Sequence, residues 1–377
     1  MRSGNGNAEL PEIVSAQGDR LRDRSGREYI DLCMGYGSVW LGHNHPAVTQ
    51  ALITQLDGYS APGYLPTAAQ DAVHMAMAAF MPDTHFLGGL YSTGMEAVET
   101  ALRAACVQTG RCDIAGFGGS VHGRSFVTAA IGGKSGAAAP EFVHTLQPFT
   151  PDGLDLLEAD LTRLSERVPL AAIIVEPVQM TAGGHEISPV ACRVLHRIAR
   201  DKGIAVIFDE TLTGLHRCGP RFYADLAGDW PDIVVLGKGM ANGFPCAAVV
   251  LRKGFAWDRA RVKPGSTFWN HPLACAAASA TMEQLSCNEA GARVERIATG
   301  ITGILGELEL RGRGAMWCLG VPDRDRIAVF AQKLLAQGVV VSYFDRYIRL
   351  LPSVMAESET LLQACGTIRK VYADTFG

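Results

Sequence analysis

The feature that most constrains the fold is a series of short apolar runs that alternate with helical patterns between residues 150 and 252. The runs are LAAIIV (170–175), IAVIF (204–208), DIVVL (232–236) and CAAVV (246–250). Each has the length of a strand and the Val, Ile, Leu and Ala content of a strand buried on both faces. A helix is expected from Ser188-Pro189, between the first two runs. Alternating strands and helices indicate an α/β fold with a largely parallel sheet.

The two ends of the chain have a different pattern. A β-hairpin is predicted around Ser25-Gly26, and a helix is predicted to start at Pro46. From about residue 272 the pattern becomes helical, and short strand-like runs then alternate with helices up to a last helix near 356–375. With 377 residues, the chain is long enough for a large α/β domain and a smaller α+β domain.

Charge and cysteine content narrow the class of protein. The net charge is −4 and no block of Lys or Arg stands out, which argues against a nucleic-acid or membrane-surface partner. The ten cysteines are scattered without a CxxC pair, as is typical of reduced thiols in a cytosolic protein. The polar N-terminus does not resemble a signal peptide, and the longest apolar runs are too short to span a bilayer. We therefore expect a cytoplasmic protein that acts on small molecules.

Charged side chains follow three of the apolar runs. Glu176 and Asp209 stand at the ends of the first two, and Lys238 follows the third after a single glycine. A lysine at the end of a buried strand is costly unless it has a task, and buried lysines are suited to Schiff-base chemistry. Because open α/β sheets bind ligands beyond the carboxyl ends of their strands, the three residues can share one crevice.

The segment STGMEAVETALR (92–103) predicts a helix whose N-terminus can hold a phosphate. Ser92 or Thr93 can cap this helix, and Gly94 permits close approach to the backbone. A capped helix is by itself usually no more than a helix. An amine, a carboxylate and a phosphate seat together suit pyridoxal phosphate, which needs an amine, an anion beside its ring nitrogen and donors for its phosphate.

Less specific interpretations remain open at this point. Lys238 can be an ordinary loop lysine, and Asp209-Glu210 can be a helix cap or a magnesium ligand. His43 and His45 can be taken for a pair of metal ligands, but no third ligand has a suitable spacing. We therefore predict no metal site.

Seven motifs resemble, in the same order, those of the class III aminotransferases of fold type I, the family of the ornithine, GABA and ω-type enzymes. They are GREYIDL with LGHNHPAV, STGMEAVETALR, VHGRS, IIVEPVQ, IFDETLTGLHRCG, PDIVVLGKGMANGFP and STFWNHPLACAAA. The resemblance runs from about Gly18 to Pro352. It implies a large cofactor-binding domain over residues 61–275 with a mostly parallel seven-stranded sheet. The smaller α+β domain would be built from residues 1–60 and 276–377.

The resemblance also implies roles for individual residues. Lys238 would form a Schiff base with pyridoxal 5'-phosphate, and Asp209 would pair with the ring nitrogen of this cofactor. Gly94 and Met95 would present backbone N–H groups to its phosphate. The other cofactor-site residues would be Val121 and His122 at the ring, Gln179 near the phenolic oxygen, and Glu176 as a supporting carboxylate.

Three further residues would serve the partner subunit or the substrate. Thr267 would reach the phosphate in a neighbouring subunit, which implies a homodimer. Arg124 would bind the substrate carboxylate, as in the ornithine and GABA branches, and Arg349 would be a structural or carboxylate-binding arginine. Both arginines can instead serve buried ion pairs.

The sequence departs from the family pattern at three places. Val121 stands where an aromatic residue usually stacks on the cofactor ring. The segment EPVQMTAGG lacks the glutamate that follows this motif in the ornithine and GABA branches and pairs with their arginine. LTGLHRCG replaces the usual glycine-rich run. The second departure puts the substrate-switching scheme of those branches in doubt.

The predicted activity is transfer of an amino group from an amino-acid or amine donor to an oxo acceptor. Lys238 would move the proton of the substrate carbon, first as a base and then as an acid. A racemase or epimerase, a decarboxylase or an aminomutase would use the same cofactor motifs and is the main alternative. A non-catalytic binding relative is a third possibility, against which the presence of Lys238 and Asp209 argues.

Overall fold

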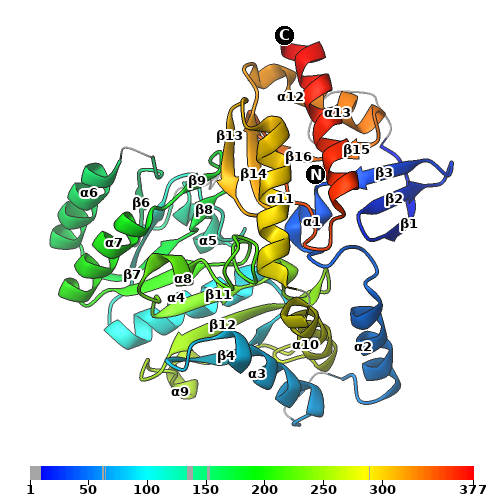
Figure 1. Cartoon of the computed structure of the whole chain (residues 1–377). Helices are drawn as coiled ribbons and strands as arrows, with labels where there is room; N and C mark the ends of the chain where they lie inside the picture. Colours follow the sequence, from blue (N-terminus) through cyan, green and yellow to red (C-terminus); the bar gives the residue numbers. More distant parts are fainter. Residues whose placement is uncertain (1–9, 62, 64, 134–138, 151–152, 288) are drawn as a thin grey trace.

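The computed structural model describes residues 10–61, 63, 65–133, 139–150, 153–287 and 289–377. Figure 1 shows one large sheet with its helices in the lower part of the molecule and two smaller sheets above it. Within the described ranges, no helix combines the length and the apolar character that crossing a membrane requires.

The large sheet has seven strands, as predicted. In spatial order they are β4 (His85–Tyr91), β12 (Ala247–Arg252), β11 (Ile233–Leu236), β10 (Ala205–Asp209), β7 (Leu170–Val175), β5 (Asp113–Phe117) and β6 (Val143–Leu146). Only β12 is antiparallel to its neighbours β11 and β4. The connection from β11 to β12, residues 237–246, contains no α-helix. Because a parallel crossover needs a longer connection, this one reverses the chain direction.

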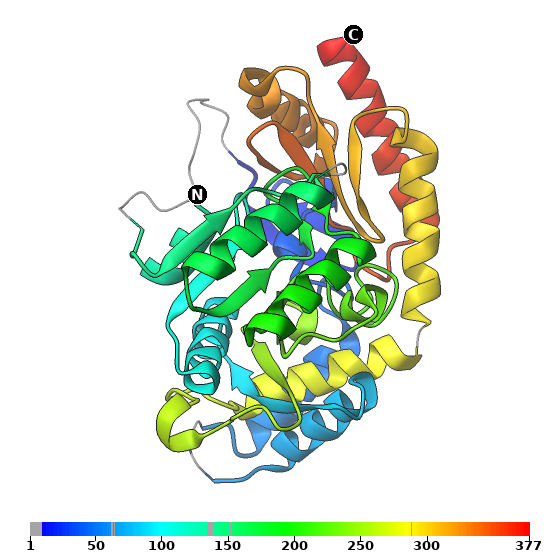
Figure 2. The same cartoon turned by 90° about the vertical axis from the view of Figure 1, so that its left-hand side faces the viewer.

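Helices cover both faces of this sheet. They are α3 (Ala68–Phe80), α4 (Gly94–Thr109), α5 (Phe126–Ile131), α6 (Leu154–Arg167), α7 (Pro189–Lys202), α8 (Ala224–Ala227), α9 (Arg259–Val262) and α10 (Pro272–Cys287). On β10, Ala205 and Ile207 join the apolar cluster of α4, whereas Val206 and Phe208 join the cluster that contains α7. This alternation is the period of two that a strand buried on both faces requires. In Figure 2, α6 and α7 run side by side as two green helices.

The helices begin where the sequence predicts. Thr93 caps α4, because its side chain accepts a hydrogen bond from the backbone N–H of Glu96. Ser188 caps α7 in the same way, with Pro189 in the first turn. Helix α2 (Pro46–Asp57) starts at the predicted proline and packs against α10. The N-terminus of α4 is thereby placed at the end of β4, beside the carboxyl edge of the sheet.

The upper part of the molecule joins the two ends of the chain. Its first sheet has the order β1 (Ile13–Gln17), β2 (Arg20–Asp23), β3 (Glu28–Asp31) and β15 (Val339–Val340). The predicted hairpin is confirmed as β2 and β3, and β3 then pairs in parallel with β15. The second sheet has the order β13 (Leu310–Arg313), β14 (Met316–Gly320), β17 (Tyr347–Leu350) and β16 (Ser342–Phe344). The domain boundaries at residues 60 and 275 stay a prediction, which this pairing of the two chain ends supports.

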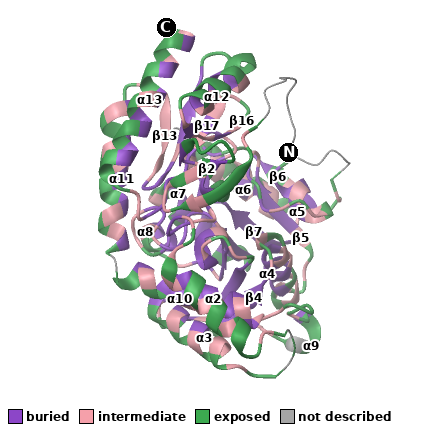
Figure 3. Cartoon of the chain, turned by 90° about the vertical axis from the view of Figure 1, so that its right-hand side faces the viewer, coloured by how far each residue is buried: buried purple, intermediate pink, exposed green. Residues whose placement is uncertain are grey.

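Three helices cover the small sheets: α11 (Ala290–Leu305), α12 (Ile327–Ala336) and α13 (Ser358–Phe376). Figure 3 shows α11 and α13 with exposed outer faces, whereas the strands of the large sheet are buried. The remaining short elements are α1 (Met34–Gly37), the strand pair β8 (Val178–Gln179) and β9 (His185–Glu186), and the 3-10 turns Lys238–Ala241 and Arg324–Arg326.

Candidate active site

The structure brings together the three charged residues that were predicted at strand ends. Glu176 follows β7, Asp209 is the last residue of β10, and Lys238 follows β11 after Gly237. These strands are neighbours, and β10 is parallel to both of the others, so their carboxyl ends meet at one edge. The charges act on one another, because Asp209 and Glu176 both oppose the lowering of the pKa of Lys238.

Lys238 is held in an unusual backbone conformation. Its φ of 42° lies in the left-handed region, which a residue with a side chain enters at some cost. The half-buried side chain donates a hydrogen bond from Nζ to Oγ1 of Thr211, at 3.0 Å. Burial lowers the pKa of the Lys238 amine, and the negative charges of Asp209 and Glu176 offset only part of this effect. A larger share of the amine is therefore neutral and nucleophilic than in an exposed lysine.

Asp209 is a buried carboxylate that stays ionised. It is 2% exposed, its Oδ2 lies 2.8 Å from Nδ1 of His122, and its Oδ1 accepts a hydrogen bond from the backbone N–H of Thr211 at 3.1 Å. Burial raises the pKa of Asp209, but the hydrogen bond and charge of His122 and the charge of Lys238 outweigh burial, so the pKa lies below its ordinary value. Asp209 can therefore act as a buried anion.

The predicted phosphate seat lies at the N-terminus of α4. The first backbone N–H groups of a helix have no partner within the helix and carry partial positive charge. Gly94 is half-buried there, and Met95 is 37% exposed. A Cβ at position 94 would lie 3.2 Å from Cγ2 of Thr211, so glycine brings this helix end close to the side chain that contacts Lys238.

Two buried side chains hold the loop that leads to Val121. Glu176 accepts a hydrogen bond from the backbone N–H of Val121 at 3.1 Å. Gln179 donates to the carbonyl of Gly118 and to the hydroxyl of Ser120, and it accepts from the backbone N–H of Phe149. Val121 itself is 38% exposed, as a residue that covers one side of a ligand would be. Both amide hydrogens of Gln179 thus bind the loop in this structure. The contact of Gln179 with a cofactor oxygen stays a prediction.

The two predicted arginines have different surroundings. Arg349 is half-buried on β17, and within the described part of the chain its buried Nε has no hydrogen-bond partner. Its guanidinium carbon lies 5.5 Å from the ring centroid of Tyr36, and its positive charge contributes to the lowered pKa of Lys238. Arg124 is exposed in the turn before α5. The position of Arg349 is thus the better suited to receive an anion near Lys238.

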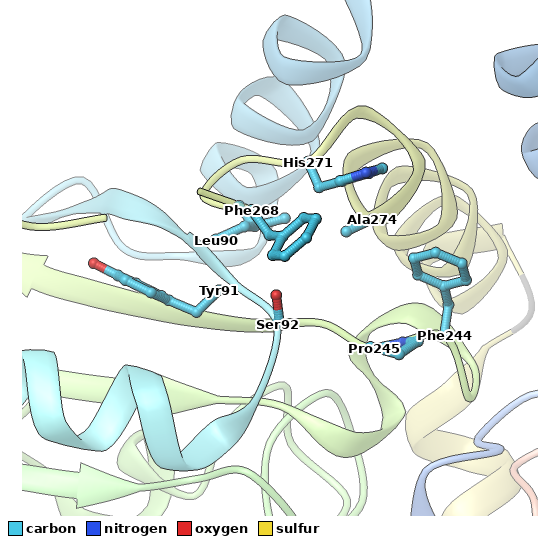
Figure 4. A pocket seen from close by; sticks show the side chains of 8 residues that line it. All are labelled: Leu90, Tyr91, Ser92, Phe244, Pro245, Phe268, His271 and Ala274. Carbon is cyan, nitrogen blue, oxygen red and sulfur yellow. The ribbon is translucent and has the colours of Figure 1, made fainter. Parts of the chain in front are cut away.

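Thr267 lies on the surface beside an apolar pocket. It is exposed in the turn before α10, next to Phe268, which is 53% exposed. Phe268, His271, Phe244 and Ser92 are among the residues that line a pocket of about 190 Å³. Figure 4 shows that Phe268 and Ser92 face one another across this pocket. The pocket therefore adjoins both Thr267 and the start of the phosphate seat.

Two residues of the site were not predicted. Thr211 contacts Lys238, and Arg217 is a fully buried cation that binds the carbonyl oxygens of Gly37 and Pro352. The guanidinium of Arg217 also lies 3.6 Å from the ring centroid of Trp40. The contacts of Arg217 join segments far apart in the chain, so only the position of Thr211, two residues after Asp209, offered a signal in the sequence.

The residues present fit pyridoxal phosphate. The amine of Lys238 can hold its aldehyde, the ionised Asp209 can keep its ring nitrogen protonated, and the N-terminus of α4 can bind its phosphate. A seven-stranded, mostly parallel sheet with these groups at its carboxyl edge is characteristic of fold type I pyridoxal-phosphate enzymes.

The comparisons with known proteins agree with this class. Residues 3–372 match the family model described as aminotransferase class-III, and the chain belongs to this family. It is 32% identical to an acetylornithine aminotransferase of Methanopyrus kandleri, over 83% of this chain and 82% of that one. It is 29% identical to a 2-aminoadipate transaminase of Pseudomonas putida, over 93% of each chain.

A solved structure confirms the fold. An amine transaminase from an uncultivated Pseudomonas species, in its PLP-bound form, superposes with a TM-score of 0.88. The two chains are 22% identical, and the match covers 99% of this chain and 98% of that chain. The protein is thus a class III aminotransferase that depends on pyridoxal phosphate, as predicted from its motifs.

Proposed function

We propose that this aminotransferase takes amino donors that carry a carboxylate, and that Arg349 binds this carboxylate. The observation that carries the proposal is the state of Arg349, whose buried Nε has no partner among the described residues. A partly buried cationic group without a carboxylate costs free energy, which a substrate carboxylate would offset through charge-assisted hydrogen bonds.

The segment after Gln179 supports this assignment. Met180, Thr181 and Ala182 follow it, so this segment carries no carboxylate that could pair with either predicted arginine. The hydroxyl of Thr181 donates to the carbonyl of Gly119 at 2.6 Å and is thereby engaged in the loop. Arg349 can therefore receive a carboxylate without first releasing one from the protein.

The assigned roles of the other residues follow from their chemistry. Bound pyridoxal phosphate supplies an electron sink for the electrons that remain on the substrate carbon when this carbon loses its proton. Lys238 attaches the cofactor and, once displaced, accepts that proton at Nζ. Asp209 holds the ring nitrogen, with His122 keeping the carboxylate ionised and oriented. The backbone N–H groups of Gly94 and Met95 bind the phosphate, and Val121 covers the ring.

The role of Lys238 is tested by absorption spectroscopy. The purified enzyme is expected to have a visible absorption band of the bound cofactor, and Lys238→Ala is expected to lose this band. A band that survives in Lys238→Ala would refute the assignment of Lys238. Conversion of the cofactor to its amino form by a panel of L-glutamate, L-alanine, 4-aminobutyrate and 1-phenylethylamine then tests transamination. Exchange of the donor's α-hydrogen without that conversion would indicate a racemase.

The role of Arg349 is tested with a matched pair of variants. Arg349→Met is expected to lower the efficiency of the half-reaction with carboxylate donors by about 10- to 100-fold, which corresponds to the loss of a charged hydrogen bond. With 1-phenylethylamine, which lacks a carboxylate, the change is expected to be small. Arg346→Met is the control, because Arg346 directly precedes β17 and binds Glu309 instead. Equal losses with both kinds of donor would contradict the proposal.

We also propose a homodimer in which Thr267 reaches the cofactor phosphate of the other subunit. A large exposed apolar side chain supports a covered surface here, since Phe268 lies next to Thr267 and is 53% exposed. Light scattering is expected to give about twice the chain mass of 40.2 kDa. A monomer that binds the cofactor with full affinity would refute this arrangement. We further propose that the enzyme is cytoplasmic, as its reduced cysteines suggest.

A further inference from the structure

We propose that Thr211 is a positioning residue for Lys238, whose hydroxyl holds the free amine and whose methyl group spaces the amine from the phosphate seat. This inference rests on the proposed role of Lys238. It adds a residue that lies between the groups assigned above and belongs to none of them. The hydroxyl of Thr211 has a polar part in this role and the methyl group a packing part, and different substitutions can separate the two.

The polar part is a chain of two hydrogen bonds. Nζ of Lys238 donates to Oγ1 of Thr211 at 3.0 Å, and the backbone N–H of Thr211 donates to Oδ1 of Asp209 at 3.1 Å. One residue thus connects the amine with the carboxylate that is assigned to the cofactor ring. Any shift of Thr211 would change the position of the amine relative to Asp209.

The packing part is the contact of the Thr211 methyl group with two glycines. A Cβ at Gly94 would lie 3.2 Å from Cγ2 of Thr211, and a Cβ at Gly237 would lie 3.3 Å from the same methyl group. Both distances are shorter than most Cβ contacts, so the methyl group fills the space that the two glycines leave. Gly94 begins α4 and Gly237 directly precedes Lys238. The methyl group therefore sets the distance between the N-terminus of α4 and the 3-10 turn that begins at Lys238.

The hydroxyl suits both protonation states of the amine. A threonine hydroxyl can accept a hydrogen bond from an ammonium group, and it can accept from or donate to a neutral amine. When a substrate amine has displaced it, Lys238 is again a free amine, which is the state bonded to Thr211 here. Nζ then accepts the proton of the substrate carbon as that C–H bond breaks. Because Thr211 holds Nζ, the lone pair of this nitrogen can approach the substrate carbon only from a narrow range of directions.

The charged groups around Lys238 must be known before its titration is interpreted. They are Asp209 on β10, Glu176 after β7, Arg349 on β17 and Arg217 in the segment between β10 and α8. None of them is changed by substitution of Thr211. A change in the titration of Lys238 in a Thr211 variant would therefore report the loss of the hydroxyl.

Two substitutions separate the hydroxyl from the methyl group. Thr211→Val keeps the shape and removes the hydroxyl, whereas Thr211→Ser keeps the hydroxyl and removes the methyl group. With the donor of the panel that reacts fastest, Thr211→Val is expected to slow the half-reaction by at least about 10-fold. Its isotope effect for a donor deuterated at the reacting carbon is expected to rise, and its cofactor affinity is expected to stay within about twofold. Thr211→Ser is expected to keep the rate within about threefold and to bind the cofactor more weakly.

The second measurement does not depend on activity. The chain has seven lysines, so the 13C-lysine spectrum of the cofactor-free protein can be resolved, and the signal missing in Lys238→Ala identifies Lys238. Loss of the hydroxyl acceptor in Thr211→Val is expected to lower the pKa of Lys238, because the ammonium form loses a hydrogen-bond acceptor. Thr211→Ser is expected to keep the pKa of the unaltered protein.

The outcomes distinguish this proposal from the function on which it rests. Thr211→Val with the rate and lysine pKa of the unaltered enzyme would refute the role of the hydroxyl. A rate in Thr211→Ser as low as in Thr211→Val would show that packing alone matters and would also overturn it. Absence of a visible band in the unaltered enzyme, or its survival in Lys238→Ala, would instead refute the assignment of Lys238.

Discussion

Glu210 makes the stability of this protein depend on pH in an unusual direction. Its side chain is 1% exposed and accepts hydrogen bonds from the backbone N–H groups of Tyr223 and Ala224, at 2.6 and 2.9 Å. The hydroxyl of Thr213 donates a third at 3.2 Å. Burial raises the pKa of Glu210 from 4.5 to about 7, and these hydrogen bonds offset only part of that rise. The carboxyl group therefore binds its proton more tightly in the folded chain than in the unfolded chain.

The magnitude follows from the two pKa values. Below pH 4.5 the carboxyl group is protonated in both states, so its contribution to stability is fully present. As the pH rises to about 7, the unfolded chain ionises while the folded chain retains the proton, and this contribution is lost. The difference of about 2.5 between the two pKa values corresponds to about 3 kcal/mol in the free energy of unfolding.

The assay is urea unfolding, followed by circular dichroism, from pH 4.5 to pH 8 with a fixed excess of cofactor. The comparison is with Glu210→Gln, which stays neutral at every pH. This variant places an amide NH2 group against a backbone donor, which costs about 1–3 kcal/mol at all pH values. Across the range the unaltered protein is expected to lose about 3 kcal/mol relative to Glu210→Gln, so that the initial gap closes or reverses, because all other groups titrate in the same way in both proteins. Parallel stability curves would refute the reasoning.

Three further changes have expected outcomes. Asp209→Asn keeps the shape of the side chain but removes its charge, so the half-reaction is expected to slow by at least about 100-fold in stopped-flow measurements; a near-normal rate would contradict the role of Asp209. His122→Ala removes the hydrogen bond that holds the pKa of Asp209 low, so the acid limb of the kcat/KM profile should move to higher pH, and an unmoved limb would count against this pairing. Gly239→Ala would bring a Cβ to 2.8 Å from Cβ of Trp40 and should cost about 1–3 kcal/mol in urea unfolding, whereas an unchanged midpoint would show that the lysine turn can shift freely.

The sequence predicts those parts of the fold that depend on local periodicity and caps. The buried runs, the hairpin of β2 and β3 and the starts of α4 and α7 were all predicted, because each depends on residues close together in the chain. The direction of β12 could not be inferred from its composition. An apolar run buried on both faces has the same appearance in either direction, and only the short connection after β11 makes it antiparallel.

The residues of the candidate site also include some that the sequence predicts and some that it does not. Glu176, Asp209 and Lys238 were predictable because the carboxyl ends of neighbouring strands meet at one edge. The partners that hold them could not be predicted, since they depend on contacts across long stretches of chain. Arg217, for example, reaches the carbonyl of Gly37, which lies 180 residues away, and His122 reaches Asp209 across 87 residues. The packing of Thr211 against two glycines depends equally on the spatial arrangement of three separate segments.

The pairing of β3 with β15 has a consequence for the order in which the chain can fold during synthesis. Ile30 pairs with Val339, so about 310 residues must be made before β3 meets its partner strand. At the usual rate of translation this takes roughly 15–60 s, far longer than the formation of a helix or a hairpin. The seven strands of the large sheet all lie between His85 and Arg252, so they can assemble in that interval. Until then the N-terminal hairpin remains on the nascent chain with the edge of β3 unpaired. This makes the hairpin the part of the nascent chain that is most exposed to incorrect strand pairing with another copy.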